Sequence, residues 1–437
     1  MTLREGLVVG AKDHLYIGGC DAVSLAQEFG TPLYVVDELY LRGMCKAFVS
    51  AMKHYAPDGM VYYASKAFSC TAMCRIALQE GMGLDVVSGG ELYTALKAGF
   101  PMNRVTLHGN CKTPGEVRMA MELGVGHIVV DSHSEISMIQ EIAASLDKQV
   151  KVQLRLNPGI ATNTHKAVQT ATTDCKFGLG IDDGEALRGV KMIAGCKNLT
   201  LTGVHVHLGS QIFDLAPYKK AVERLTDFMM FCLPVLGTEL TELVIGGGFG
   251  VHYTENDPPT LEPREVVRVI AEEVRRQADR KGMRVPQLIL EPGRIIVAEA
   301  GVMLYTVSSI KRIPGVRTYI GVDGGMADNP RVALYGGKYE ALLANRAKEK
   351  VTDTYALAGR ACETGDVFGY DFRLPPPEVG DILAMPTAGA YQYSMASNYN
   401  RVPIPAVVLT HYGKAAPIVE RQRYEDITQY DRIPNWL

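Results

Sequence analysis

Short, strongly apolar runs alternate with longer amphipathic stretches through the first 300 residues of the chain. In the longer stretches, such as residues 71–80, apolar side chains recur three and four positions apart, which predicts helices. Runs that are apolar at consecutive positions predict strands buried on both faces, and such strands form parallel sheets. We predict eight of them, at residues 61–64, 84–87, 105–108, 127–130, 152–156, 201–206, 243–245 and 288–290. Eight strand–helix units within about 250 residues predict an α/β fold, the (β/α)₈ TIM barrel.

The pattern changes in the last third of the chain, where short β-rich runs are separated by Gly and Pro turns. These runs lie at residues 302–308, 318–322, 353–357, 382–384 and 407–410. They predict a second, mostly antiparallel β-domain. Residues 33–36 are also strand-like and precede the barrel pattern. We therefore expect residues 1–37 to pack with the β-domain, residues 38–298 to form the barrel, and residues 299–437 to form the β-domain.

Composition and charge exclude several classes of protein. Of the 437 residues, 47% are hydrophobic and 21% are charged, which is typical of a globular protein with a sizeable core. The 45 basic and 48 acidic residues leave no positive excess to bind a phosphate backbone, so we expect no nucleic-acid partner. The start of the chain lacks the apolar run of a signal peptide, and residues 228–236 are too few to cross a bilayer. We expect a cytoplasmic protein with no membrane partner.

The nine cysteines are irregularly spaced. Cys70 and Cys74 stand at helical spacing, but no second pair completes a zinc site, so we expect no bound metal. Apart from Cys362, we expect the cysteines to be reduced thiols in the core.

In a barrel of this kind, the residues that carry chemistry follow the carboxyl ends of the strands. Lys66 follows the first strand. Its amine either extends to solvent or lies desolvated in the barrel mouth, where it can form a Schiff base. His205 and His207 follow the sixth strand and point the same way. They are compatible with half a metal site, with an imidazole lying flat against a ring, or with a structural role.

The last two strands are followed by groups that suit a phosphate and a cation. Residues 246–250 read Gly-Gly-Gly-Phe-Gly, which can direct several N–H groups at an anion, although any tight turn would also use glycine. The next loop holds Glu291 and Arg294. A carboxylate at the barrel mouth needs a cationic partner. A carbonyl for Lys66, a flat ring for His207, a phosphate for the glycines and a ring nitrogen for Glu291 together describe pyridoxal 5′-phosphate.

Longer motifs identify a family resemblance that covers nearly the whole chain. The sequence resembles the alanine-racemase-like (fold type III) pyridoxal-phosphate decarboxylases and, among them, the enzymes that act on meso-2,6-diaminopimelate. The motifs are YASKAF (63–68), DVVSGGEL (85–92), HGNCK (108–112), HVHLGSQ (205–211), GGGFG (246–250), EPGR (291–294), DGGMADNPRVALY (323–335), CETGD (362–366) and GAYQYSMASNYN (389–400). One departure is Phe68, where many relatives have asparagine.

The resemblance implies a role for each matching position. The catalytic residues would be Lys66, His207, Glu291 and Cys362. The cofactor-binding residues would be Lys66, Asp85, His207, Ser210, Gly246, Gly247, Gly248, Gly250, Glu291, Gly293, Arg294 and Tyr391. The substrate-binding residues would be Arg294, Arg331, Tyr335, Glu363 and Tyr391. The family also implies a homodimer with shared active sites, in which Cys362 reaches the site of the second subunit and donates a proton there.

The chemistry of these residues indicates the reaction and the substrate. Glu291 keeps the cofactor nitrogen protonated, whereas alanine racemases place an arginine there, so a glutamate favours decarboxylation over racemisation. Arg331 and Tyr335 stand four residues apart and could present a guanidinium and a hydroxyl together, although a solvated surface arginine is the simpler explanation of Arg331 alone. With Arg294 and Glu363, they favour a substrate with two amino-acid heads, meso-2,6-diaminopimelate, decarboxylated at its D-centre to L-lysine and CO₂.

Two alternatives stay open at this point. One is a related decarboxylase of another basic amino acid or of carboxynorspermidine. The other is a binding protein without catalytic activity that uses the same barrel. Retention of Lys66, Glu291 and Cys362 argues against the second alternative.

Overall fold

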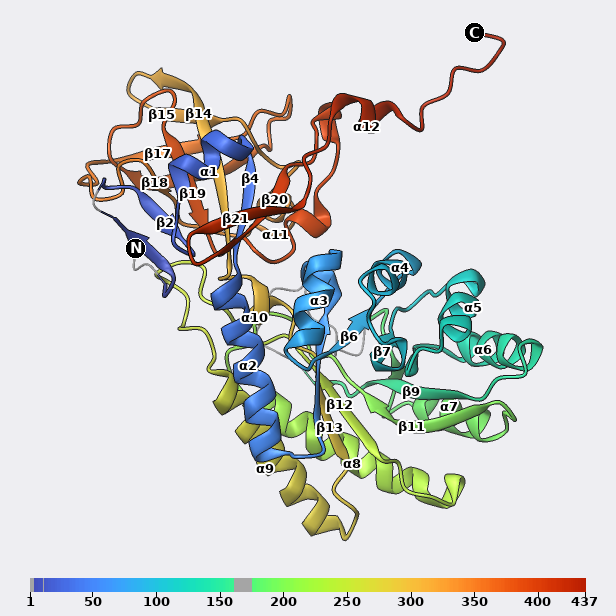
Figure 1. Cartoon of the computed structure of the whole chain (residues 1–437). Helices are drawn as coiled ribbons and strands as arrows, with labels where there is room; N and C mark the ends of the chain where they lie inside the picture. The colour runs from blue at the N-terminus through green and yellow to red at the C-terminus, as the bar shows by residue number, and fades with distance from the viewer. Residues whose placement is uncertain (1–3, 11, 161–174) are drawn as a thin grey trace. The chain divides into compact units, whose positions relative to one another are not determined.

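The computed structural model describes residues 4–10, 12–160 and 175–437, which form two compact units (Figure 1). The β-unit comprises Met1–Arg42, His252–Pro258 and Val297–Leu437, and the barrel unit comprises Gly43–Val251 and Pro259–Ile296. Within the described ranges, no helix combines the length and the apolar composition needed to cross a membrane.

Eight parallel strands close on themselves in the barrel unit, as the sequence predicts. Their order is β9, β11, β12, β13, β5, β6, β7 and β8, and pairing of β8 with β9 closes the cylinder. The strands are β5 (Met60–Ala64), β6 (Gly83–Val86), β7 (Val105–Leu107), β8 (His127–Val130), β9 (Val150–Asn157), β11 (Leu199–His205), β12 (Glu242–Gly246) and β13 (Gln287–Leu290). A two-residue strand, β10 (Leu179–Gly180), extends β9.

Helices follow the barrel strands, and several begin at side-chain caps supplied by the preceding loops. They are α3 (Thr71–Gln79), α4 (Gly89–Lys97), α5 (Pro114–Leu123), α6 (His133–Ser145), α7 (Glu185–Ala194), α8 (Ala216–Leu236) and α9 (Pro263–Lys281). Ser88 accepts a hydrogen bond from Glu91 N at the start of α4, and Thr113 and Glu116 form a capping box on α5. The serine of the DVVSGGEL motif therefore has a structural role.

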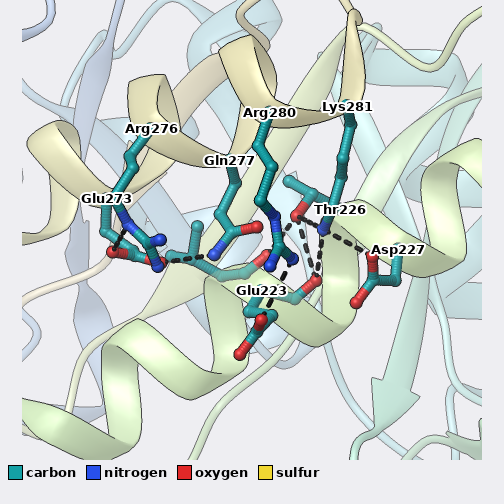
Figure 2. Close-up of polar contacts among 9 residues, drawn as sticks. Glu223, Thr226, Asp227, Glu273, Arg276, Gln277, Arg280 and Lys281 are labelled. Atoms are coloured by element: carbon teal, nitrogen blue, oxygen red, sulfur yellow. Dashed lines mark hydrogen bonds and ion pairs between the residues drawn. The ribbon is translucent and has the colours of Figure 1, made fainter.

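A polar network joins α8 to α9 (Figure 2). Lys281 Nζ, in the last turn of α9, lies 2.7 Å from both Thr226 Oγ1 and Asp227 Oδ1 of α8 and 2.9 Å from the Glu223 carbonyl oxygen. Arg280 pairs with the Glu223 carboxylate at 3.0 Å. These contacts fix the packing of two helices that begin after β11 and β12, the strands whose loops carry candidate site residues.

A second polar cluster lies where the strands enter the barrel, at the amino ends of β8 and β12. Glu242 accepts hydrogen bonds from Gln153 Nε2 at 2.8 Å and Thr202 Oγ1 at 2.7 Å, and it lies 3.1 Å from His127 Nε2. Burial raises the pKa of Glu242, but these hydrogen bonds and the His127 charge outweigh it and lower the pKa to about 2. The carboxylate is therefore ionised at neutral pH.

The β-unit is built on a sheet that is antiparallel at most of its pairings. Its strand order is β18, β17, β15, β14, β4, β20 and β21, and β19 and β16 branch from β14. The strands are β4 (Leu33–Asp37), β14 (Gly301–Ile313), β15 (Arg317–Val322), β16 (Leu342–Leu343), β17 (Asp353–Ala358), β18 (Val367–Leu374), β19 (Ile382–Pro386), β20 (Ala406–His411) and β21 (Lys414–Val419). The prediction of a second, antiparallel-rich domain is confirmed.

The N-terminal segment forms part of the core of the β-unit. It contains β1 (Leu7–Val9), β2 (Leu15–Ile17), β3 (Cys20–Asp21) and α1 (Ala22–Phe29), followed by β4. Leu33 and Val35 of β4 are fully buried and pack in one cluster with Leu15, Leu304 and Val408. Strand β4 pairs antiparallel with β14 and parallel with β20, so it occupies an interior position in the sheet. The helix α2 (Glu38–Tyr55) follows it directly.

Candidate active site

The carboxyl ends of the barrel strands carry all the barrel residues singled out in the sequence. Lys66 lies in a short 3₁₀ helix, η1 (Ser65–Ala67), directly after β5, and is half-buried. Asp85 is buried in the last half of β6. Half-buried His207 follows β11, and buried Glu291 follows β13. Parallel strands end on one face of the barrel, so these side chains belong to one mouth.

The glycine run after β12 needs glycine for two reasons. Gly246 and Gly248 have φ angles of +69° and +94°, which side chains disfavour. A Cβ atom at Gly247 would lie 2.2 Å from the Glu291 carbonyl oxygen, and one at Gly248 would lie 2.2 Å from the Gly209 carbonyl oxygen. Only glycine lets the loops after β11, β12 and β13 approach this closely. Alternating positive φ angles favour an anion-binding turn.

Arg294 and Ser210 lie together at the same loops. Arg294 begins α10 (Arg294–Val297) and donates hydrogen bonds to Ser210 Oγ from Nε at 3.2 Å and Nη2 at 2.8 Å. Gly293, just before it, packs so that an added Cβ would lie 3.0 Å from the Ala64 Cβ. A guanidinium, a hydroxyl and the glycine turn form a cradle that suits a phosphate.

Glu291 contacts two histidines from different strands. Its Oε2 lies 3.0 Å from His205 Nε2, and its Oε1 lies 3.1 Å from His108 Nε2. His108 Nε2 also lies 3.6 Å from Asp85 Oδ1. Burial raises the pKa of Glu291, but the charges of His108 and His205 and their hydrogen bonds hold it well below its usual range. A glutamate at this position is therefore an anion.

Asp85 and His207 also belong to this mouth, and burial and neighbouring charges shift the pKa of each. Burial raises the pKa of Asp85, while His108 and Lys66 lower it and Glu291 raises it further. Burial together with the charges of Lys66 and Arg155 holds the pKa of His207 well below its usual value. His207 is thus a neutral imidazole, and its Nδ1 accepts a hydrogen bond from Gly247 N at 3.4 Å. A neutral ring can lie against an aromatic cofactor without repelling a protonated pyridine.

These residues fit pyridoxal 5′-phosphate. Asp85 Oδ1, Ser65 Oγ and His205 Nδ1 are buried and form no hydrogen bond within the described part of the chain, which leaves polar groups for a ligand at this mouth. Lys66 would supply the amine, the Arg294–Ser210 cradle suits the phosphate, and ionised Glu291 suits the ring nitrogen.

Among the residues that the structure describes, no group suited to a metal contains both His205 and His207, the pairing that was one alternative from the sequence. His205 instead lies with His108 and Glu291, whose ligating atoms are all within 4.8 Å of one another. Two imidazoles and a carboxylate are also a set that binds zinc. In this structure, however, both Nε2 atoms lie within hydrogen-bond distance of the Glu291 carboxylate and contact it directly.

His108 lies in the HGNCK motif but is not among the predicted site residues. The same rule that found Lys66 and Glu291 would have found it, because His108 directly follows β7. Arg155, on β9, was also missed. Its guanidinium stacks on Phe177 at 4.2 Å and its Nε lies 3.6 Å from Asp131 Oδ1.

The β-unit carries the remaining predicted residues. Arg331 begins α11 (Arg331–Tyr335) and is only 8% exposed, so it is not a solvated surface arginine. Its Nη1 donates to the hydroxyls of Tyr253 at 3.0 Å and Tyr339 at 2.7 Å, and its guanidinium lies over both rings. Tyr335, at the other end of the helix, is 37% exposed. The hydroxyl partners of Arg331 are thus two tyrosines that sequence reasoning did not single out.

Cys362 and Glu363 lie in an exposed loop held by buried groups. Asp366 is buried, and its two carboxylate oxygens each accept a hydrogen bond at 2.7 Å, from Met326 N and from Ala361 N. Cys362 N donates to Asn400 Oδ1 at 2.9 Å. The thiol loop is thereby fixed at both ends while its side chains remain exposed.

Tyr391 lies in the β-unit, is half-buried and has a φ angle of +58°. A non-glycine residue with positive φ is uncommon and often marks a functional position.

Three cysteines other than Cys362 lie outside the core. The prediction that eight cysteines lie in the core is wrong for three of them, because Cys111 is exposed and Cys175 and Cys196 are only partly buried. These three follow or precede loop turns, where a single cysteine gives no periodic signal.

Separately, a hollow of about 800 Å³ in the β-unit is lined by residues such as Thr254, Tyr339 and Phe372 and by none of the predicted site residues.

Comparison with known proteins identifies the class to which this fold and site belong. Residues 42–298 match the family described as "Pyridoxal-dependent decarboxylase, pyridoxal binding domain". The protein is therefore an enzyme that uses pyridoxal 5′-phosphate. Over 425 residues it is 46% identical to diaminopimelate decarboxylase from Bacillus subtilis (strain 168), covering 96% of this chain and 95% of that protein. The chain belongs to the diaminopimelate decarboxylase family.

Solved structures agree with this family. Diaminopimelate decarboxylase from M. jannaschii in co-complex with L-lysine is 35% identical, with a TM-score of 0.92 and full coverage of both chains. The enzyme from Helicobacter pylori complexed with L-lysine is 31% identical, with a TM-score of 0.85 over 94% of this chain and 98% of that chain. A lysine/ornithine decarboxylase from Vibrio vulnificus, at 22% identity and a TM-score of 0.74 over 89% of this chain and 97% of that chain, shares the fold.

Proposed function

We propose that the enzyme decarboxylates meso-2,6-diaminopimelate at its D-centre and releases L-lysine and CO₂, the last step of lysine biosynthesis. The observation that carries this proposal is the 46% identity to a diaminopimelate decarboxylase over almost the full length of both chains. Two relatives of known structure hold L-lysine, which would be the product here.

The barrel residues are proposed to bind the cofactor and set its charge. Pyridoxal 5′-phosphate, when bound, accepts the electron pair that decarboxylation leaves on the substrate. Lys66 binds the aldehyde through its amine. Glu291, an anion because of His108 and His205, holds a proton on the ring nitrogen. Neutral His207 lies against the ring, and the glycine turn, Ser210, Gly293 and Arg294 hold the phosphate.

The β-unit residues are proposed to select the substrate. A second amino-acid head carries a carboxylate and an ammonium, so its site needs a cation and an anion. Arg331 provides a buried guanidinium with only Nη1 engaged by tyrosine hydroxyls among its described contacts. Arg294 and Tyr335 complete the carboxylate contacts, and Glu363 pairs with the ammonium. Tyr391 contacts cofactor and substrate.

Cys362 is proposed to protonate the carbon that loses CO₂. We propose a cytoplasmic homodimer in which the Cys362 of each subunit serves the site of the other. Exposure of Cys362 and Glu363, on a loop fixed by buried Asp366, supports this assignment, since a residue that serves a second subunit must be exposed in the single chain.

The function is tested by measuring CO₂ release from a panel of substrates. We expect release from meso-2,6-diaminopimelate and little from L-lysine, ornithine, arginine or carboxynorspermidine. Preference for any of these others would overturn the substrate assignment. K66A should lose both turnover and the visible absorbance of the bound cofactor, while K148A, a lysine of the α6–β9 loop, should retain both.

Subunit sharing is tested by mixing two inactive variants, K66A and C362A. If Cys362 serves the partner's site, mixed dimers contain one intact site, and random exchange restores about a quarter of wild-type activity. An inactive mixture of dimers that demonstrably exchange subunits would exclude sharing.

A further inference from the structure

The Glu291 carboxylate lies at the centre of a row of buried ionisable groups. His205 contacts one of its oxygens at 3.0 Å and His108 contacts the other at 3.1 Å, and Asp85 lies 3.6 Å beyond His108. Each side chain in the row is at most 6% exposed. The four residues lie at the ends of four different strands, β6, β7, β11 and β13, or directly after them. Their proximity is therefore not a result of local chain geometry.

The two histidines have different charges. His108 lies between two carboxylates, and although burial lowers its pKa, the charges of Asp85 and Glu291 raise it above the ordinary value. Glu291 is the one carboxylate that acts on His205, so burial, together with the charges of His108 and Arg155, lowers its pKa to about 4. The two carboxylates thus favour the protonated, cationic form of His108, whereas His205 is a neutral N–H donor at neutral pH.

We propose that His108 and His205 are positioning residues: His108 balances the charge of Glu291, and His205 orients the carboxylate toward the cofactor's ring nitrogen. This rests on the proposed role of Glu291. Without the His108 cation, Asp85 and Glu291 would be two buried carboxylates in one site, and one of them would take up a proton. A protonated Glu291 could not hold a proton on the ring nitrogen.

The barrel contains a matched pair that serves as a control. His127 and Glu242 also lie 3.1 Å apart, but at the amino ends of their strands, opposite to the mouth. Removing His127 therefore disrupts a similar ion pair in the same unit without reaching the cofactor residues.

The first test measures cofactor binding by apoprotein prepared from wild type, H108Q, H205Q, E291Q, H127Q and the double variant H108Q/E291Q. We expect H108Q and H205Q to bind pyridoxal 5′-phosphate about tenfold more weakly or worse. The double variant should be no weaker than E291Q alone, because the histidine acts through the carboxylate. H127Q should lower only the melting temperature. Additive effects in the double variant, or unchanged affinity in H108Q, would overturn the proposal.

The second test follows the absorbance of the bound cofactor with pH. His108 loses its proton on the alkaline side of an ordinary imidazole pKa of about 6.5. We expect a spectral transition there in wild type and in H127Q that is absent from H108Q. The charged and titratable groups around the row are Lys66, Glu91, Arg155 and His207, and burial raises the pKa of Glu91 to about 7. A transition retained in H108Q would assign it to one of these and contradict the proposal.

Two controls keep the tests decisive. If H108Q does not fold, as judged by its melting temperature, H108N takes its place. Elemental analysis of the holoenzyme is expected to find no stoichiometric zinc, and a zinc ion bound by these histidines would overturn the assignment. These tests measure cofactor binding, so they are independent of the substrate panel: a different substrate would refute the proposed function without affecting them.

Discussion

Arg294 directs two N–H groups at a single oxygen, Ser210 Oγ, at 3.2 and 2.8 Å. This contact links the loop after β11 to the start of α10, on either side of the glycine turn after β12. The serine therefore orients the guanidinium at the point where three strand ends meet, and a phosphate bound there would find both groups in place.

Replacing Ser210 by alanine should weaken cofactor binding by about tenfold, the cost of one charge-assisted hydrogen bond. Titration of the apoprotein with pyridoxal 5′-phosphate measures this. Ser145 provides the control, because its Oγ accepts a hydrogen bond from Arg118 Nη2 at 3.2 Å on exposed helices of the same unit. S145A should bind the cofactor as wild type does, and equal losses in both variants would contradict the prediction.

Arg331 should affect the substrate rather than the cofactor. In R331Q, the tyrosine hydroxyls of Tyr253 and Tyr339 lose their charged donor, and the second carboxylate of the substrate loses its cation. We expect kcat/KM for meso-2,6-diaminopimelate to fall by about 10- to 100-fold, from the loss of one buried ionic contact. Cofactor affinity should not change.

The matched control for Arg331 is Arg346, which pairs with Asp381 and Glu349 in the same unit. R346Q should lower the melting temperature and leave the KM of the folded enzyme unchanged. A normal KM in folded R331Q would exclude a role in substrate binding.

Asp366 should control the loop that bears Cys362 and Glu363. An asparagine can accept a hydrogen bond on only one side-chain atom, so D366N must release either Met326 N or Ala361 N. A thiol misplaced by about 1 Å costs on the order of 100-fold in kcat. Steady-state kinetics should show this loss with normal cofactor absorbance, and hydrogen exchange should be faster in residues 359–366. D381N, which changes another buried aspartate of the β-unit, should reduce stability only.

The Glu242 cluster should make stability depend on pH in the acid range. Its pKa of about 2 lies below the ordinary value of 4.5, so the ionised carboxylate stabilises the fold above pH 4.5. That stabilisation, about 3 kcal/mol, is lost as the pH falls from 4.5 toward 2. The free energies of unfolding of wild type and E242Q in urea should therefore differ at pH 7 and converge on acidification. E265Q, which removes a solvent-exposed partner of Arg268, should show almost no difference at either pH.

The sequence was sufficient to predict the barrel because its strands are short apolar runs and its helices have a clear period. It also located Lys66, Glu291 and the glycine turn, since each follows such a run directly. Strands with mixed patterns escaped prediction. For example, β18 alternates buried and exposed residues irregularly, and β21 has no fully buried residue.

Contacts between distant segments could not be predicted in the same way. His108 and Glu291 are 183 positions apart along the chain, yet they meet because barrel closure brings all strand ends to one rim. The partners of Arg331 depend on packing in the same manner, since Tyr253 lies in a segment between two barrel elements but belongs to the β-unit. Pattern identifies the strand end, whereas only the closed structure shows which ends face one another.

The interior position of β4 has a consequence for how the chain acquires its fold during synthesis. This strand leaves the ribosome early, but its neighbours β14 and β20 begin only at Gly301 and Ala406. The barrel, whose last strand ends at Leu290, can close before β20 is translated. An apolar N-terminal strand must therefore wait unpaired through most of translation, and a nascent chain halted after the barrel would expose it to chaperones and to strands of other chains.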